Sequence, residues 1–298
     1  MKTVETKAAL REELADARRT GSRIGLVPTM GYLHEGHLSL LAAAGRDCDF
    51  VVMSLFVNPT QFRPGEDFER YPRDRERDGR LAAEAGVDLI YAPEVGDVYP
   101  PAFRTSVEVN GLTEVMCGDP ASRGPEHFRG VTTIVAKLFN AVGPDVAYFG
   151  QKDAQQAAVI RRMVRDLDYP IEIEVLPTIR EPDGLAMSSR NAYLGPADRE
   201  RATALRRALL SAEEASGQEP STSAALDAAR RVLSEAGVEP EYLEARDAER
   251  LEPIESFNGR PVLLAVAARF GPARLIDNVI VEPAENAGNA EAAGSRTG

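Results

Sequence analysis

The chain has 298 residues, of which 43% are hydrophobic and 28% charged, with 24 glycines and 20 prolines. These proportions are typical of a folded globular protein and exclude a collagen, a coiled coil and a wholly disordered chain. The 35 basic and 47 acidic side chains give a net charge of −12, which argues against an extended nucleic-acid surface.

The sequence indicates neither a membrane span nor a secretory signal. Its longest apolar stretches, 50–57 and 262–268, are far shorter than the roughly 20 residues that cross a bilayer. The first residues lack the apolar core of a signal peptide. We therefore expect a cytoplasmic protein that binds neither membrane nor nucleic acid. Cys48 and Cys117 have no zinc-site or disulfide-framework spacing, so we expect them to be free thiols.

Apolar periodicity predicts alternating helices and strands over the first part of the chain. The order begins with a helix over 4–19, a strand over 22–27 that ends before Pro28, a turn-rich segment over 28–37 and a helix from Leu38. The expected elements that follow are a buried strand over 50–57, a helix over 73–85, a strand over 89–92, a helix over 130–142, a strand over 146–149, a helix over 153–166 and a strand over 171–176. This alternation predicts an α/β fold with a Rossmann-like, doubly wound parallel sheet.

The pattern changes after Ser189, which predicts a domain boundary near residues 180–195. Two helices, over 197–216 and 221–236, precede strands over 242–246, 262–270 and 275–281. We expect a first domain over 1–185 and a smaller α+β domain over 186–282. Residues 283–298 carry no apolar pattern, and we expect this tail to be disordered.

Two histidines, His34 and His37, stand three residues apart where a helix is predicted to begin. The N-terminus of a helix favours an anion such as phosphate, and two imidazoles there could stabilise charge that develops during phosphoryl or nucleotidyl transfer. A helix cap and a half-buried histidine remain the alternative. A metal pair is disfavoured because the HExxH spacing is absent, and neither a GxGxxG loop nor a P-loop is present.

Two further polar segments contain candidate phosphate contacts. Residues 150–156 follow a predicted strand, at the edge where open α/β sheets bind ligands. Lys152 lies there and is one of only four lysines in the chain, which indicates a phosphate contact, with a solvated surface lysine as the alternative. The segment Met187-Ser-Ser-Arg190 offers two hydroxyls and a guanidinium to phosphate oxygens, although alone it would be a polar turn.

These segments, in this order, resemble those of a known family. Pro28-Thr-Met-Gly-Tyr-Leu-His34-Glu-Gly-His37 is similar to the HIGH motif of the nucleotidyltransferase superfamily, and Met187-Ser-Ser-Arg190 resembles its KMSKS-type loop. Further matches are Phe56-Val-Asn-Pro-Thr-Gln61-Phe and Phe149-Gly-Gln-Lys-Asp-Ala-Gln-Gln156. Over about 20–282 the chain resembles the pantoate–beta-alanine ligase family.

The resemblance implies an ATP-dependent ligase that condenses pantoate with β-alanine. The products would be pantothenate, AMP and pyrophosphate, formed through an enzyme-bound pantoyl adenylate with Mg²⁺ as cofactor. Residues 1–185 would be the nucleotide-binding catalytic domain and 186–282 a lid domain, and the protein would be a homodimer. No side chain is assigned as a metal ligand.

The resemblance also implies the residues of the site. The catalytic group would be His37, His34, Lys152, Ser188, Ser189 and Arg190. The ATP contacts would be Met30, Gly31, Tyr32, Leu33, His34, Glu35, Gly36, His37, Gly150, Gln151, Lys152, Asp153, Ile179, Met187, Ser188, Ser189 and Arg190. Gln61 and Gln156 would bind pantoate and β-alanine, because an amide offers both a donor and an acceptor.

Three positions depart from the patterns to which the chain is compared. Gln151 stands where the family usually has Glu, Ala154 where it has an aromatic residue, and Ala186 where a full KMSKS loop has lysine. The last departure, which is common in the family, leaves more of the phosphate contact to Lys152.

The sequence leaves some assignments open. A nucleotidyltransferase that keeps the nucleotide on its product would share the histidines and the Ser-Ser-Arg loop, but would not require Gln61 and Gln156. A non-catalytic nucleotide-binding regulator is the alternative from another class. The apolar helix over 131–138, with Phe62, could form a wall for the gem-dimethyl group of pantoate or simply pack in the core. His127 and Arg129 could belong to the site, cap a helix or contact a partner subunit.

An adenylate intermediate must be shielded from water. We therefore expect a mobile loop over the site, and the charged segment 63–80, which contains glycine and proline, is the best candidate.

Overall fold

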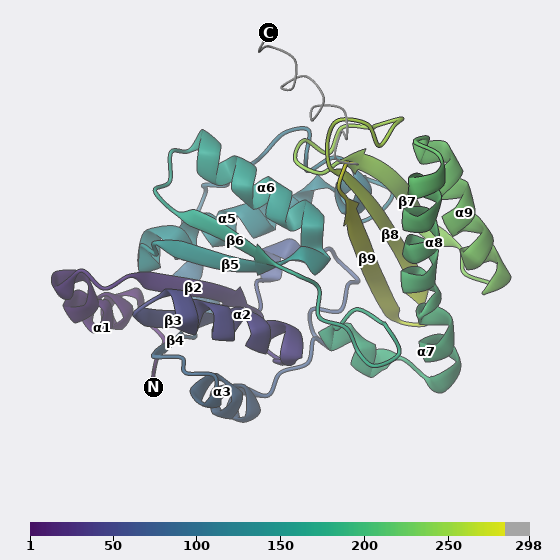
Figure 1. Ribbon diagram of the computed structural model, residues 1–298. Coiled ribbons are helices and arrows are strands. Elements are labelled where there is room, and N and C mark those ends of the chain that lie inside the picture. The colour runs from purple at the N-terminus through teal and green to yellow at the C-terminus, as the bar shows by residue number, and fades with distance from the viewer. Residues whose placement is uncertain (284–298) are drawn as a thin grey trace, which may run out of the picture.

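A computed structural model describes residues 1–283 of the chain (Figure 1). The predicted tail, apart from its first residue, lies outside the described residues. Six parallel strands form the larger sheet in the order β1-β4-β3-β2-β5-β6. The strands are β1 (Lys2–Val4), β2 (Ile24–Thr29), β3 (Phe50–Leu55), β4 (Leu89–Tyr91), β5 (Val146–Gly150) and β6 (Glu172–Leu176). The expected doubly wound parallel sheet is thus confirmed.

Helices cover both faces of this sheet (Figure 1). One face packs against α1 (Lys7–Thr20), α5 (Pro125–Val142) and α6 (Ala154–Asp166), and the other against α2 (Glu35–Asp47) and α3 (Arg75–Glu84). Successive residues of β3 enter opposite cores, Val52 on the α5 side and Val51 on the α2 side. The central strands are mostly apolar because both of their faces are buried.

Several predicted boundaries differ from the structure, and α5 begins five residues earlier than expected; three of the differences have clear local reasons. Strand β1, which pairs with β4 at the sheet edge, is too short to show a period, and Thr6 caps α1 by accepting from Ala9 N at 3.2 Å. Helix α2 begins at Glu35, not Leu38, because His34 is its N-cap. Strand β2 continues through Pro28; its pairing with β5 ends at Leu26, so by residue 28 the strand is free on that side and tolerates proline.

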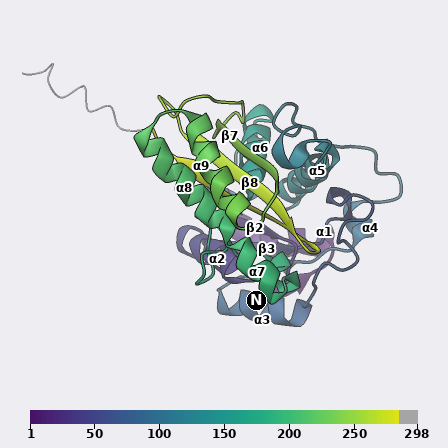
Figure 2. The same ribbon diagram turned by 90° about the vertical axis from the view of Figure 1, so that its right-hand side faces the viewer.

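The other sheet has three antiparallel strands, β7 (Pro240–Asp247), β8 (Val262–Phe270) and β9 (Ala273–Val281). Its outer face packs against α8 (Ala204–Gln218) and α9 (Thr222–Glu235) around a separate apolar core. Figure 2 shows these two helices side by side over the strands. The helix predicted over 197–216 is divided into α7 (Pro196–Ala202) and α8. Both cysteines are free.

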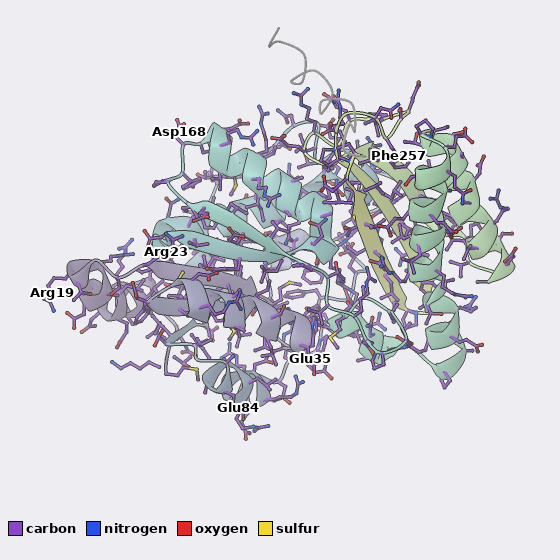
Figure 3. The ribbon with its side chains drawn as sticks, viewed as in Figure 1. Arg19, Arg23, Glu35, Glu84, Asp168 and Phe257 are labelled. Atoms are coloured by element: carbon purple, nitrogen blue, oxygen red, sulfur yellow. The ribbon has the colours of Figure 1, made fainter. Side chains whose placement is uncertain are left out.

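The strand order reverses beside β2, which pairs with β3 on one side and with β5 on the other. The chain leaves β2 through α2, on one face, and leaves β5 through α6, on the opposite face. A crevice forms at the carboxyl ends of strands at such a switch point. In the view of Figure 3, Glu35 marks the end of α2 that points toward the second sheet, whereas Arg19 and Arg23 lie at the far end of the molecule. Within the described residues, every helix is too short or too polar to span a membrane.

Candidate active site

A cavity of about 240 Å³ opens at the carboxyl ends of β2, β5 and β6. It is the position that the reversal of strand order predicts. The walls come from segments far apart in the chain: the end of β2 with the start of α2, the region around Gln61, one side of α5, the junction of β5 and α6, and two stretches near 178 and 188.

The turn between β2 and α2 has an unusual backbone that a buried carboxylate stabilises. Gly31 and Tyr32 both have positive φ, 89° and 53°. A Cβ on Gly31 would lie 2.7 Å from Leu55 Cδ1, so only glycine fits there. Asp78 of α3 is 1% exposed, and its two oxygens accept from Tyr32 N and Leu33 N, both at 2.8 Å. These bonds fix the direction in which His34 and His37 enter the cavity.

The two histidines form a reciprocal cap at the start of α2. His34 Nδ1 accepts from Gly36 N at 3.1 Å, and His37 Nδ1 accepts from His34 N at 3.3 Å. The imidazole centroids are 4.1 Å apart. Because each Nδ1 accepts a backbone hydrogen bond, a neutral ring must carry its proton on Nε2. Each histidine can therefore present an N–H donor to a ligand.

Both imidazoles have pKa values below the ordinary value of histidine. Burial, together with the positive charge of Lys152, lowers the pKa of His34 to about 4. Burial and the neighbouring His34 and Lys152 lower the pKa of His37 to about 3. At neutral pH the pair therefore offers oriented donors without carrying a net charge.

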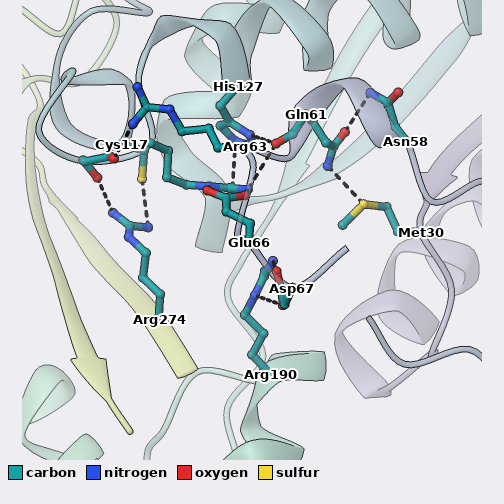
Figure 4. Close-up of polar contacts among 12 residues, drawn as sticks. Met30, Asn58, Gln61, Arg63, Glu66, Asp67, Cys117, His127, Arg190 and Arg274 are labelled. Atoms are coloured by element: carbon teal, nitrogen blue, oxygen red, sulfur yellow. Dashed lines mark hydrogen bonds and ion pairs between the residues drawn. The ribbon is translucent and has the colours of Figure 1, made fainter. Parts of the chain in front are cut away.

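The cations of the cavity are partly neutralised by acidic residues. Lys152 Nζ lies 3.4 Å from Asp153 Oδ2. Arg190 makes a bidentate pair with Asp67, with Nε–Oδ2 and Nη2–Oδ1 distances of 3.0 and 3.1 Å (Figure 4). The adjacent Glu66 binds Arg123 at 2.6 and 3.0 Å. An anionic ligand would therefore enter a cavity whose positive charges already have partners.

The amide of Gln61 is held in one orientation. Asn58 Nδ2 donates to Gln61 Oε1 at 3.1 Å, and Gln61 Nε2 approaches Met30 Sδ at 3.0 Å (Figure 4). Gln156, in the first turn of α6, also lines the cavity. Its neighbour Gln155 instead binds the backbone at Leu112, Val115 and Cys117, so the two glutamines have different tasks.

Helix α5 supplies the apolar side of the cavity. Its lining residues are Val131, Ile134, Val135 and Leu138, which also belong to the main core. The helix therefore packs in the core and forms a wall of the cavity at the same time. Phe62 does not line the cavity; it packs against Phe68 and Tyr71 at centroid distances of 5.4 and 6.0 Å.

Of the two residues left open on this helix, only His127 reaches the cavity. It does not cap α5: its Nδ1 lies 2.8 Å from Gln61 O and its Nε2 3.0 Å from Arg123 Nη1. Because Arg123 can only donate, the neutral ring has its proton on Nδ1 and donates to the carbonyl of Gln61. Arg129 is exposed and lies outside the cavity.

Most of the residues chosen from the sequence line this one cavity. They are Met30, His34, Gly36, His37, Gln61, Gly150, Lys152, Asp153, Gln156, Ile179, Met187, Ser188, Ser189 and Arg190. Gly31, Tyr32, Leu33, Glu35 and Gln151 are not among its lining residues. Leu33 packs in the core, Glu35 is exposed, and Gln151 Nε2 bonds to Asn278 Oδ1 at 3.0 Å.

Sequence reasoning missed Asn58, Tyr71, Arg123 and Thr178, which also line the cavity. Asn58 lies inside the matching segment 56–62 and Tyr71 inside the expected lid segment. Their closeness in sequence to residues already assigned to the site could have indicated them. Thr178 Oγ1 is buried without a hydrogen-bond partner in the described structure. An unpaired buried hydroxyl destabilises the folded state, and a hydrogen bond to a bound ligand or water would remove this penalty. No group of three or more His, Cys, Asp or Glu side chains in residues 1–283 is placed to hold a metal ion.

Comparison with known proteins gives one consistent family. The model of the family described as "Pantoate-beta-alanine ligase" matches residues 2–280. A pantothenate synthetase from Moorella thermoacetica is 55% identical, covering 95% of this chain and 99% of its own length. A crystal structure of pantothenate synthetase from Thermus thermophilus is 50% identical with a TM-score of 0.88, covering 95% of this chain and all of the other.

A second solved structure contains ligands. It is a pantoate-beta-alanine ligase from Francisella tularensis, described as complexed with beta-gamma ATP and beta-alanine. It is 30% identical to this chain with a TM-score of 0.77, and the match covers 94% of this chain and 97% of the other.

Proposed function

The chain belongs to the pantoate–beta-alanine ligase family, and we propose how its cavity joins pantoate to β-alanine at the expense of ATP. The pantoate carboxylate attacks the α-phosphorus of ATP and pyrophosphate leaves, which gives pantoyl adenylate. The amine of β-alanine then attacks the acyl carbon, AMP leaves, and pantothenate is formed. The observation that carries this assignment is the pair of oriented, neutral histidines in the same cavity as Lys152, Arg190 and two glutamines.

His34 and His37 stabilise the phosphates while charge is redistributed in the first step. Each presents an Nε2–H at the N-terminus of α2, where the helix dipole adds positive potential. Neutral donors suit this task because they need no proton exchange during the reaction. Donors that are held in place before the reaction contribute most, since they do not have to reorganise in the transition state.

Lys152 and Arg190 supply the full positive charges. In the described structure Arg190 is paired with Asp67, so we propose that the triphosphate takes the place of that carboxylate when ATP binds. Ser188 and Ser189 add hydroxyl donors on the same segment. Ile179 and Met187 flank the adenine, and Asp153 accepts from the ribose hydroxyls.

Gln61 and Gln156 bind the acid and the amine substrates. Asn58 occupies the oxygen of the Gln61 amide, and the N–H₂ group is therefore the part of Gln61 that is directed to the substrate carboxylate or hydroxyl. The apolar residues of α5 face the gem-dimethyl group of pantoate. This division places the carboxylate beside the phosphates and the methyl groups away from them.

Mg²⁺ is proposed to enter with ATP. Among the residues of 1–283 that line the cavity, Asp153 is the one carboxylate, and this donor set would suit a Mg²⁺ ion whose ligands are mainly phosphate oxygens and water. When bound, the ion neutralises charge on the triphosphate. Treatment with EDTA should stop pyrophosphate release and added Mg²⁺ should restore it; activity that persists in EDTA would refute this cofactor.

Three further assignments accompany the mechanism as proposals. We infer a homodimer, testable by light scattering. We infer that 1–185 and 186–282 act as the catalytic and lid domains, which limited proteolysis between them would test. We infer a cytoplasmic location, where the substrate ATP is available, and cell fractionation would test it.

The two-step reaction can be tested by omitting β-alanine. With ATP, Mg²⁺ and pantoate alone, pyrophosphate should be released in an amount close to that of the enzyme, and AMP and pantothenate should follow when β-alanine is added. An enzyme that keeps the nucleotide on its product would release pyrophosphate but no AMP after β-alanine is added. Absence of pantoate-dependent pyrophosphate would refute the adenylate mechanism.

A further inference from the structure

Two adjacent side chains of β9, Asp277 and Asn278, are buried and have no role in the mechanism above. They are 2% and 5% exposed. Asn278 Nδ2 donates to the carbonyl oxygens of Gln151 and Lys152, both at 2.9 Å, and its Oδ1 accepts from Gln151 Nε2 at 3.0 Å. Both donors of this amide therefore hold the backbone of the segment that carries Lys152.

Asp277 holds the second segment of the proposed ATP site, the one that leads to Met187–Arg190. Its carboxylate accepts a bidentate pair from Arg180 at 2.7 and 2.9 Å. Arg180 belongs to a short hairpin in which it bridges to Ala186 and Met187 N donates to Ile179 O at 3.0 Å. The segment Met187–Arg190 leaves directly from the base of this hairpin.

The two anchor points are neighbours on one strand. Consecutive Cα atoms are about 3.8 Å apart, and Asn278 N also donates to Asp277 Oδ1 at 2.8 Å, which fixes the Asp277 side chain relative to the backbone. In Figure 1, β9 is the strand of the second sheet that lies beside the ends of β5 and β6. Two segments far apart in the chain are thus held by a single element, and a fixed spacing of this kind is what orients reacting groups.

We propose that Asp277 and Asn278 are positioning residues for ATP. They set the spacing between Lys152 and the segment Met187–Arg190, so that the second sheet forms part of the scaffold of the nucleotide site. The inference rests on the proposed roles of Lys152 and Arg190. Binding groups that are held in place by a supporting layer of hydrogen bonds lose less entropy when the ligand arrives.

The amide of Asn278 allows a sharp test. Asn278→Asp keeps the size of the side chain but removes both donors and places a carboxylate against two carbonyl oxygens. The Lys152 segment must then move away, while the contacts of Arg190 are left in place. The matched control is Ile280→Val, which alters the same face of the same strand at a residue that packs in a separate apolar cluster.

The experiment measures kcat, the KM for ATP and the thermal midpoint, following pantoate-dependent pyrophosphate release by the full chain. We expect Asn278→Asp to lower kcat/KM for ATP at least tenfold, and Ile280→Val to leave it within twofold even where the thermal midpoint falls equally. A folded Asn278→Asp enzyme with kcat/KM for ATP within twofold of the parent would overturn the proposal.

A second variant keeps the test decisive if Asn278→Asp does not fold. The double change Arg180→Met with Asp277→Leu removes the bidentate pair and leaves no buried charge unpaired. We expect this variant to lower kcat/KM for ATP at least fivefold. An unchanged kcat/KM would overturn the proposal. Lys152→Ala is assayed in parallel. If Lys152→Ala has no effect, the site assignment itself fails and the proposal with it; if only Lys152→Ala has an effect, the positioning role alone fails.

Discussion

Replacing His37 tests both its observed cap of α2 and its proposed donation to phosphate. Nδ1 accepts the backbone N–H of His34, and Nε2–H is left for the ligand. His37→Ala removes both. We expect adenylate formation to slow by about two to three orders of magnitude, or about 2.7–4 kcal/mol, the range for loss of one transition-state donor. The lost cap should lower the free energy of unfolding by about 1 kcal/mol.

Two further variants distinguish these effects. In His37→Asn the side-chain oxygen can take the place of Nδ1 and keep the cap, but the amide does not reach the position of Nε2. In His37→Gln the amide N–H₂ can reach that position. We therefore expect His37→Asn to be stable but slow, and His37→Gln to recover part of the rate.

The assay is single-turnover pyrophosphate release with ATP, Mg²⁺ and pantoate, combined with urea unfolding of each variant. A His37→Ala enzyme that releases pyrophosphate at nearly the parent rate would refute the donor role. A slow His37→Ala enzyme that His37→Gln fails to improve while His37→Asn restores it would assign the whole effect to the cap.

The histidines, Gly130 and the segment 63–80 give three more predictions. Burial lowers the pKa of all three histidines, whereas in the unfolded chain they take up a proton near pH 6.5. Because the unfolded state binds more protons as the pH falls from 7.5 to 5.5, the free energy of unfolding should fall by about 1.4 kcal/mol per histidine. Equal urea midpoints at the two pH values would contradict this prediction. A Cβ on Gly130 would lie 2.4 Å from Thr60 O, so Gly130→Ala should cost about 1–3 kcal/mol and raise the KM for pantoate by displacing Gln61; a normal KM would show that this contact does not position Gln61. The expected lid segment 63–80 was too long, because 75–80 belong to α3 and Asp78 is buried there. ATP with pantoate should slow proteolysis within 63–74, and equal cleavage rates with and without them would refute a lid in this segment.

The sequence predicted five of the six strands of the larger sheet, because these five are apolar runs separated by amphipathic helices, whereas β1, at three residues, shows no period. The choice of His34, His37 and Lys152 followed from their position after predicted strands, and the strand order brings those strand ends together. Residues that directly follow predicted strands can be assigned to one site because the carboxyl ends of parallel strands meet at the same edge of the sheet.

Contacts made across the fold could not be predicted in the same way. Asp78 looks like one more charge in an acidic and basic segment, yet its carboxylate is buried and holds the turn before His34. Asn278 lies in an apolar strand and reaches the Lys152 segment, which is far earlier in the chain. These roles depend on contacts between residues that are far apart in the sequence, and the hydrophobic period of a segment does not predict such contacts.

In the proposed reaction, the carboxylate of pantoate attacks the α-phosphorus of ATP in this cavity. The most direct test uses pantoate labelled with ¹⁸O in its carboxylate, with ATP, Mg²⁺ and β-alanine, and mass spectrometry of the products. AMP should acquire one ¹⁸O atom, because an oxygen of the carboxylate stays on the phosphorus when β-alanine displaces AMP. Unlabelled AMP, with ¹⁸O found in inorganic phosphate or pyrophosphate, would contradict this reaction.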